Sequence, residues 1–354
     1  MDIGIGLDPT LRLNIEQQKE MSREAARLGY QSIWTPEVPG QMDSYQICLM
    51  RWAASNEIVE GGLQTGIAVS PVMWRTPMAF AMTGGAISHM TNGKFIMGIG
   101  AGGAYRPDVR KSIGLPKMSA LALMRDYITI IKELVNEGKT DYEGEVGVMK
   151  GGRMSINPLP ATPVYLGALG PKMLQLAGEL ADGAALNWCA PEQVAWSREK
   201  IVEGAEKVGR DPSEIKISEY IRICVDENED KARIALAKAT MHYALGATVP
   251  TEKERSFGYR AHFERMGFTS ELADLDEMRK KGASRDEVAD AFPVDLLRTV
   301  GYFGSAKNAA AEFARISKGL DHTIVRVVSS RPGTIEGTLD VMKACAPDKV
   351  RPKL

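Results

Sequence analysis

Cysteine and histidine are scarce in this sequence, which contains four of each among 354 residues. The cysteines lie far apart and form no Cys-x-x-Cys pair; they are Cys48, Cys189, Cys224 and Cys345. This spacing argues against a disulfide framework and against a zinc knuckle. The histidines lack the spacing of metal ligands, and no Ser/His/Asp arrangement is evident. We therefore expect neither a metal site nor a hydrolytic triad.

An excess of charge of one sign is also absent, because 44 basic and 45 acidic residues give a formal net charge of −1. No basic stripe interleaved with aromatic residues is visible, which argues against a nucleic-acid partner. No apolar run is long enough to span a bilayer, and the chain starts with the alternating segment Ile3–Leu7 rather than a charged leader. We expect a cytoplasmic protein that acts on a small molecule and binds no membrane.

What the sequence does contain is a repeated alternation of apolar strands with amphipathic helices, and 44% of the residues are hydrophobic. Eight strands are predicted; they begin at Ile3, Ser32, Leu63, Phe95, Pro163, Gly183, Ile215 and Ile324. Strands that alternate with helices indicate a parallel sheet, and eight of them favour a closed barrel over an open sheet. The sequence thus predicts an α/β fold, a (β/α)8 TIM barrel, as a single domain over residues 1–354.

Two stretches interrupt this rhythm. Tyr142–Asn157 has the pattern of a strand-rich excursion. Residues from about 248 to 303 are polar and mostly helical, and we interpret them as an insertion before the eighth strand that forms a lid or a dimer contact.

In a TIM barrel the active site forms at the C-terminal ends of the strands, so the residues that follow each strand are the candidates. Gly98, Gly100 and Gly103 follow the fourth strand and formally match Gly-x-Gly-x-x-Gly, the dinucleotide fingerprint. The match is weak because it does not open the chain and Pro107 interrupts any helix that starts at Gly103. A tight turn and a close approach of backbone to a planar ring both remain open for this segment.

A second glycine-rich turn, Gly167–Lys172, follows the fifth strand and leads directly into a predicted helix over Met173–Leu180. Backbone amides at such a helix start suit a phosphate or another anion, and Lys172 adds positive charge. The alternative is a tight turn with a surface lysine. A barrel with glycine-rich turns, few titratable groups and no metal pattern fits an enzyme whose organic cofactor supplies the chemistry.

Three segments resemble the luciferase-like flavin and deazaflavin oxidoreductases. Gly61–Pro71, with Arg75-Thr76-Pro77 after it, resembles the third-strand region of luciferase-like monooxygenases, and Ser88–Gly102 resembles their fourth-strand signature. The most specific segment, Pro163–Gly183, is similar to methylenetetrahydromethanopterin reductases, which use the deazaflavin coenzyme F420. The resemblance covers nearly the whole chain, with residues 248–303 the least similar part.

The resemblance implies a luciferase-like barrel in which a non-prolyl cis peptide within Gly66, Ile67 and Ala68 backs the cofactor ring. It also implies which residues line the cofactor and hold its phosphate side. The ring-lining residues are Gly100, Ala101 and Gly102, with Asn187 as a further neighbour. The phosphate side falls on Gly167, Ala168, Leu169, Gly170, Pro171 and Lys172. A homodimer or homotetramer is expected.

The chain departs from the family pattern at two acidic positions. Pro36-Glu37 stands where the family's F420 enzymes often carry Asp-His, and Gly103 stands where some relatives have a catalytic glutamate. Asp8 and Glu37, at the ends of the first two strands, are therefore the acid–base candidates. A carboxyl partly buried beside a ring would have a raised pKa suited to that role. A helix cap or a loop salt bridge is the alternative for each.

Three functions follow from these residues and motifs, in descending order. The first is an F420-dependent oxidoreductase that transfers a hydride between C5 of the deazaflavin and an electrophilic carbon, such as a pterin-bound methylene group. The second is an FMN-dependent luciferase-like monooxygenase. The third is a non-catalytic flavin-binding barrel.

Overall fold

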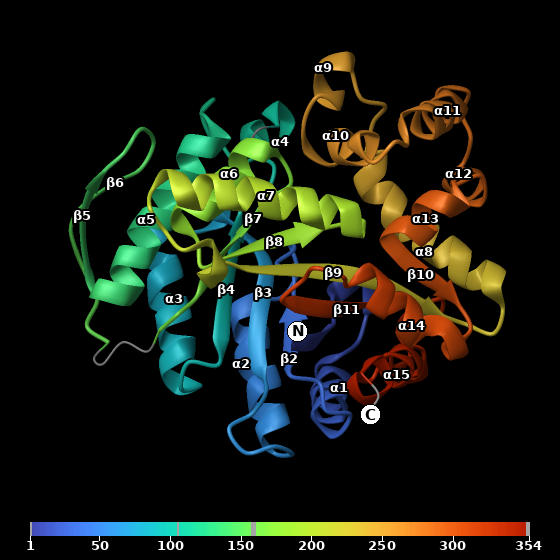
Figure 1. Ribbon diagram of the computed structural model, residues 1–354, viewed down its shortest axis with the longest axis horizontal. Helices are drawn as coiled ribbons and strands as arrows, with labels where there is room; N and C mark the ends of the chain where they lie inside the picture. The colour runs from blue at the N-terminus through green and yellow to red at the C-terminus, as the bar shows by residue number, and fades with distance from the viewer. Residues whose placement is uncertain (1, 105, 157–160, 352–354) are drawn as a thin grey trace.

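A computed structural model, which describes residues 2–104, 106–156 and 161–351, contains a closed barrel of eight parallel strands (Figure 1). The strands are β1 (Asp2–Gly6), β2 (Ser32–Thr35), β3 (Gln64–Pro71), β4 (Phe95–Gly100), β7 (Val164–Gly167), β8 (Gly183–Asn187), β9 (Lys216–Val225) and β11 (His322–Val328). They run in the order β9-β11-β1-β2-β3-β4-β7-β8, and pairing of β8 with β9 closes the barrel. The predicted (β/α)8 barrel is confirmed.

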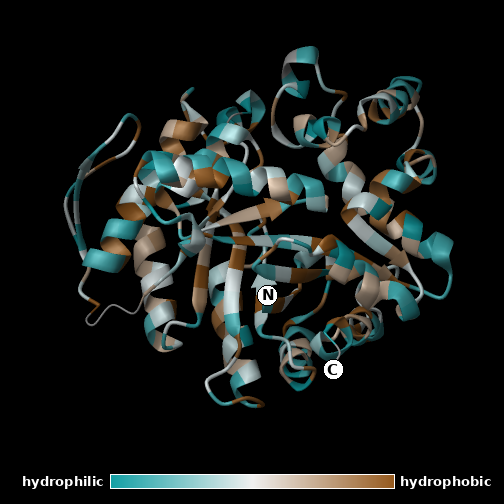
Figure 2. Ribbon diagram, in the orientation of Figure 1, coloured by the Kyte–Doolittle hydropathy of each residue, from teal (hydrophilic) through white to brown (hydrophobic). Residues whose placement is uncertain are grey.

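Helices surround the barrel and pack their apolar faces on the strands. The main ones are α1 (Ile15–Arg27), α2 (Ser44–Asn56), α3 (Pro77–Met90), α5 (Ala120–Glu137), α6 (Pro171–Leu180), α7 (Pro191–Lys207), α8 (Glu229–Ala244), α14 (Ala306–Ile316) and α15 (Ile335–Ala344). Shorter ones are α4 (Pro107–Ser112) and α16 (Pro347–Val350). Figure 2 shows hydrophobic colour along the barrel strands and mixed colour on the helices, as expected when one helical face is buried. No helix in the described segments is long and apolar enough to cross a membrane.

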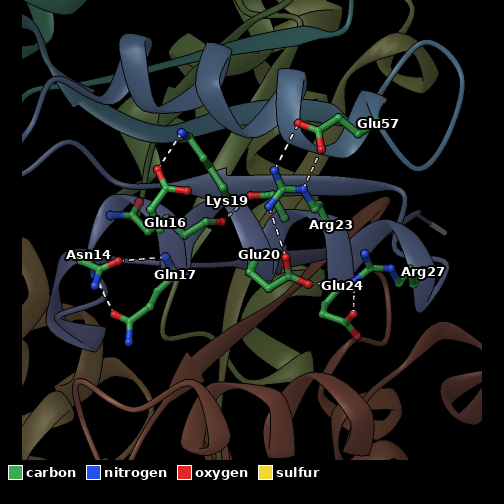
Figure 3. Close-up of polar contacts among 11 residues, drawn as sticks. Asn14, Glu16, Gln17, Lys19, Glu20, Arg23, Glu24, Arg27 and Glu57 are labelled. Atoms are coloured by element: carbon green, nitrogen blue, oxygen red, sulfur yellow. Dashed lines mark hydrogen bonds and ion pairs between the residues drawn. The ribbon is translucent and has the colours of Figure 1, made fainter.

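Helix α1 illustrates how local chemistry sets these elements. Asn14 accepts the backbone N–H of Gln17 and the Gln17 side chain accepts that of Asn14, a reciprocal capping box that starts the helix. Its outer face carries a ladder of charged contacts, and Arg23 reaches Glu57 just beyond α2 (Figure 3). Met21, on the opposite face, is fully buried. The same helix thus satisfies its own N-terminus, the solvent and the core.

The insertion is helical as predicted, but it ends in a strand. It contains α9 (Glu252–Arg255), α10 (Gly258–Arg265), α11 (Thr269–Lys280), α12 (Arg285–Asp290), α13 (Val294–Val300) and strand β10 (Gly301–Gly304). Strand β8 pairs with β9 as far as Tyr220, and β10 takes over that edge from Arg222 onward. The insertion therefore adds a ninth strand that extends the sheet past the barrel rim. It also has its own apolar core, which includes Phe263, Leu296 and Trp188.

The predicted excursion after α5 is an antiparallel hairpin of β5 (Lys139–Glu143) and β6 (Val148–Arg153), separate from the barrel sheet (Figure 1). It begins three residues before the predicted start, and Asn157 lies outside the described residues. Asp126 of α5 fixes the turn, because its carboxylate accepts the backbone N–H groups of Val146 and Gly147.

The barrel interior is filled by large rings that small residues make room for. Trp34 is fully buried among Tyr165, Tyr220 and neighbouring aliphatic side chains. A Cβ atom on Gly66 would lie 2.4 Å from the Trp34 ring, so only glycine fits there. This layer closes the barrel from below, and the candidate site lies above it, at the C-terminal ends of the strands.

Candidate active site at the barrel mouth

A shallow platform lies at the end of β3. The pairing of β3 with β4 shifts register between Ile67 and Ser70, and a cis peptide bond joins Ala68 to Val69. The sequence placed this bond within Gly66–Ala68, so it lies one residue later than predicted. Ala68 and Val69 are both half-buried and carry no polar side-chain atoms.

Glycines on the two neighbouring strands make room for Val69. A Cβ atom on Gly100 would lie 2.6 Å from a methyl group of Val69, and one on Gly167 would lie 3.2 Å from both Val69 methyl groups. Gly98 is still more restricted, because its Cβ atom would lie 1.9 Å from the carbonyl oxygen of Ile67. A cradle of small, uncharged residues that any added Cβ would fill fits the face of a planar tricyclic ring.

The segment after β4 is a turn that admits only glycine at one position. Gly102 has φ +55°, and a Cβ atom there would lie 2.3 Å from Cβ of Pro71. No helix starts at Gly103; the next one, α4, begins at Pro107. The dinucleotide fingerprint is therefore not formed, and the close-approach interpretation of this turn fits the structure.

The turn from β7 into α6 has an open helix start. Gly170 is the N-cap and makes no side-chain cap, Pro171 follows, and Lys172 is exposed. Arg265 of α10, which sequence reasoning missed, donates to the carbonyl oxygen of Leu169 at 2.9 Å. Two cations thus lie near backbone donors at the start of a ten-residue helix. This arrangement suits the phosphate that the sequence assigns to the turn.

Asp8 lies at the mouth after β1 and is buried. Its carboxylate accepts the backbone N–H of Thr10 at 2.7 Å, which caps the short turn Pro9–Leu11, and it forms an ion pair with the buried Arg326 of β11. Both structural alternatives for Asp8, a cap and a salt bridge, are present. Arg326 is a residue that sequence reasoning missed, although it occurs at an inward position of an otherwise apolar strand.

Glu37 lies directly beside the β3 bulge. Its backbone N–H donates to the carbonyl oxygen of Val69 at 3.3 Å, and its carboxylate pairs with Arg75 and accepts the Ser70 hydroxyl. Arg75 also pairs with Asp43 and stacks over Tyr45, 4.8 Å from the ring centroid. Glu37 is therefore next to the ring platform, but it is held by an arginine rather than isolated beside apolar groups as expected.

Asn187, at the end of β8, is the centre of a polar chain. Its Oδ1 accepts a hydrogen bond from Arg222 of β9, and its Nδ2 donates to the hydroxyl of Tyr259 at 2.7 Å. Arg222 also stacks over Trp188, 3.7 Å from the ring centroid. Sequence reasoning missed Arg222 and Tyr259. An inward-facing arginine in the apolar run Ile215–Val225 was the available signal.

A cavity of about 350 Å³ adjoins this mouth. The turn after β4 forms one wall, with Gly102 and Gly103, and the insertion forms the other, with Tyr243, Phe257 and Tyr259. Its size and aromatic walls suit a small organic molecule. A larger cavity, of about 530 Å³, lies between α7 and α10 around Trp196 and includes none of the β3 or β4 residues.

Below the insertion lies a buried titratable group, Glu219, which accepts the backbone N–H of Cys189 at 2.6 Å. Burial raises the pKa of Glu219 to about 8, so this carboxyl is protonated at neutral pH. Beside it, burial lowers the pKa of His262 to about 4, and its Nε2 lies 2.7 Å from the carbonyl oxygen of Trp188. Both groups are uncharged at pH 7 and support the loop that carries Asn187. Over the described ranges, no three His, Cys, Asp or Glu side chains converge as metal ligands do.

A family model described as luciferase-like monooxygenase matches residues 3–323. Among curated proteins, the 5,10-methylenetetrahydromethanopterin reductase of Archaeoglobus fulgidus is 33% identical over 180 residues, which are 51% of this chain and 53% of that protein. The chain thus matches about half the length of this relative. The reductase of Methanolobus tindarius is 26% identical over 325 residues, 92% of this chain and 91% of that protein.

Solved structures show the same fold. The coenzyme F420-dependent tetrahydromethanopterin reductase from Methanopyrus kandleri superposes with a TM-score of 0.75 at 19% identity and covers 97% of both chains. The FMN complex of the oxygenating constituent of 3,6-diketocamphane monooxygenase from Pseudomonas putida superposes with a TM-score of 0.66 at 13% identity, covering 100% of this chain and 99% of that one.

Proposed function

The chain belongs to the luciferase-like monooxygenase family, and from this premise we propose that it is a coenzyme F420-dependent oxidoreductase. The reaction is hydride transfer between C5 of the deazaflavin and an electrophilic carbon of a small molecule, as in 5,10-methylenetetrahydromethanopterin reductase. Curated relatives with that name match the chain at 33% and 26% identity, which supports F420 ahead of FMN.

The observation that carries the proposal is the pairing of a ring-sized platform with an anion-binding turn on neighbouring strands. Ala68 and Val69 of β3 form the platform, and Gly167–Lys172 joins β7 to α6 with an open helix start. The bound deazaflavin supplies the hydride chemistry, and the protein supplies position and electrostatics. Lys172 and Arg265 would hold the phosphate side.

The acid–base roles remain with Asp8 and Glu37, but the two residues differ in access. Glu37 accepts from Ser70 immediately beside the platform, whereas Asp8 is held within the buried pair with Arg326. We therefore assign to Glu37 the orientation of the platform edge and any proton relay there. Asp8 chiefly balances the charge of Arg326. The insertion closes one side of the cavity and excludes water from it.

An FMN-dependent monooxygenase is the second candidate. It is favoured by the fold likeness to FMN-bound monooxygenase structures, and the platform accepts either tricyclic ring. A barrel that binds a flavin without turnover is the third candidate.

Equilibrium titration of the purified protein with F420 and with FMN, followed by absorbance and fluorescence, tests the proposal. We expect F420 to bind at least tenfold more tightly than FMN, and the Lys172→Ala variant to lose a large part of that affinity. Lys150→Ala, on the distant β5–β6 hairpin, is the matched control and should bind normally. Tight FMN binding without affinity for F420 would refute the first proposal in favour of the second. Binding without turnover of any acceptor would support the third.

A further inference from the structure

Three arginines are buried at the barrel mouth, and sequence reasoning anticipated none of them. Arg51, Arg222 and Arg326 are 3%, 2% and 7% exposed. Arg222 and Arg326 are direct register partners on the parallel strands β9 and β11, so their side chains project from the same face. Both lie over the ring of Tyr220, with guanidinium carbons 5.9 and 4.7 Å from its centroid. Like charges at this separation repel one another unless anions compensate them.

The compensation within the described residues is incomplete. Arg326 is paired with Asp8. Arg51 donates to neutral acceptors, the carbonyl oxygens of Leu7 and Trp34 and the side chain of Gln18.

Arg222 also has neutral partners, the Asn187 amide and the carbonyl oxygen of Tyr220. The nearby carboxyl of Glu219 does not offset it, because burial raises the pKa of Glu219 to about 8. Burial lowers the pKa of Arg51 to about 10 and that of Arg326 to about 9, both still above neutral pH. Three buried cations and one buried anion therefore leave an excess of two positive charges.

Buried charges without a counter-ion are costly, and proteins ordinarily pair them. Arg51 is tied to the ends of β1 and β2 by the two carbonyl groups it contacts, and Arg326 is neutralised by Asp8. Arg222 differs because it is bonded to Asn187, one strand from Gly167 and the platform. Its uncompensated charge is thus the one that borders the proposed ring site.

We propose that Arg222 provides the positive charge that favours a bound cofactor ring in its anionic, two-electron-reduced form over its neutral oxidised form. This inference rests on the proposed function, since it requires a flavin or deazaflavin at the mouth. Addition of a hydride brings two electrons and one proton to the ring, so the ring gains one negative charge and no other reactant is required. A fixed cation in a poorly solvated site stabilises that charge without direct contact.

The test uses two variants of the full-length protein, Arg222→Met, which removes the charge at similar side-chain size, and Arg222→Lys, which retains it. Dissociation constants are measured anaerobically for oxidised and for dithionite-reduced F420, and likewise for FMN. In Arg222→Met we expect affinity for the reduced cofactor to fall by about 10- to 100-fold, while affinity for the oxidised cofactor changes by less than about threefold. Tenfold in this ratio corresponds to about 30 mV in the two-electron midpoint potential, which potentiometry measures independently.

Arg222→Lys should keep the ratio of the two affinities within about threefold of the wild-type value. Arg315→Met, at an exposed arginine of α14, controls for general effects of the substitution and should change neither affinity. Circular dichroism and thermal unfolding establish that the variants are folded. A packing role for Arg222 would weaken both cofactor forms equally, and that result, or an unchanged ratio in Arg222→Met, would overturn the inference alone. Failure of the wild-type protein to bind either cofactor would instead refute the proposed function, and the inference with it.

Discussion

Replacing Asp8 with asparagine removes one negative charge from the barrel mouth while keeping the size of the side chain. The carboxylate is 4% exposed and its partner Arg326 is 8% exposed, so the pair is sealed from solvent. Loss of one member of a buried ion pair typically costs about 3–5 kcal/mol, because the other charge stays buried without compensation. Asparagine can still accept the Thr10 backbone N–H, so the cap is kept and we expect a loss of about 3 kcal/mol.

The assay is urea unfolding at pH 7 of the wild type, Asp8→Asn, Arg326→Met and the double variant. If the cost arises from the unpaired charge, the double variant should be within about 1.5 kcal/mol of the wild type although each single variant loses more. A loss below about 1 kcal/mol for Asp8→Asn, or simple additivity in the double variant, would refute this reasoning. Turnover separates the remaining alternative, because a proton-transfer role for Asp8 predicts at least a tenfold lower kcat in the double variant even though stability is restored.

Three further predictions address other parts of the molecule. Because the folded-state pKa of Glu219, about 8, lies above its ordinary value of 4.5, the folded state holds a proton that the unfolded state releases, so wild-type stability should fall as pH rises from 4.5 to 8. Glu219→Gln should remove roughly 4 kcal/mol of that fall, measured as urea-unfolding free energies at pH 5 and pH 8, and equal slopes in both proteins would contradict the assignment. Gly98→Ala should destabilise the protein by about 3 kcal/mol or prevent folding, since its Cβ atom would meet a backbone carbonyl oxygen at 1.9 Å, whereas Gly167→Ala meets only methyl groups at 3.2 Å and should cost far less in thermal unfolding. Helix α3 contains no Asp, Glu, Lys or Arg and exposes Met82 by 57%, so we expect this face to be covered in a homo-oligomer; Met82→Glu should lower the mass measured by light scattering, Val208→Glu should not, and a monomeric wild type would refute the expectation.

Strand and helix positions were readable from the sequence because their signal is local. The apolar runs and helical periodicities along the chain correspond to the eight barrel strands and to most of the surrounding helices, since each element must bury one face whatever it packs against. Strand β10 and helix α14 were not predicted. The first is only four residues long, and its partner is the exposed edge of β9, which exists only after the barrel has formed.

The candidate site divides in the same way. The glycines at 98, 100 and 167 mark a close approach that the sequence indicates, but the structure shows that the neighbour they accommodate is Val69. The acidic candidates Asp8 and Glu37 were identified at strand ends, yet their arginine partners were not.

The sequence by itself thus determined that this is a barrel with small residues and two carboxylates at its mouth, because those properties repeat within a few residues. Tertiary structure alone decided that Asp8 meets Arg326, more than 300 positions later, and that Arg222 lies beside it without a counter-ion. The physical reason is that closing the barrel places the first and last strands side by side. The balance of charge at its centre is therefore a property of strands that are distant in the chain.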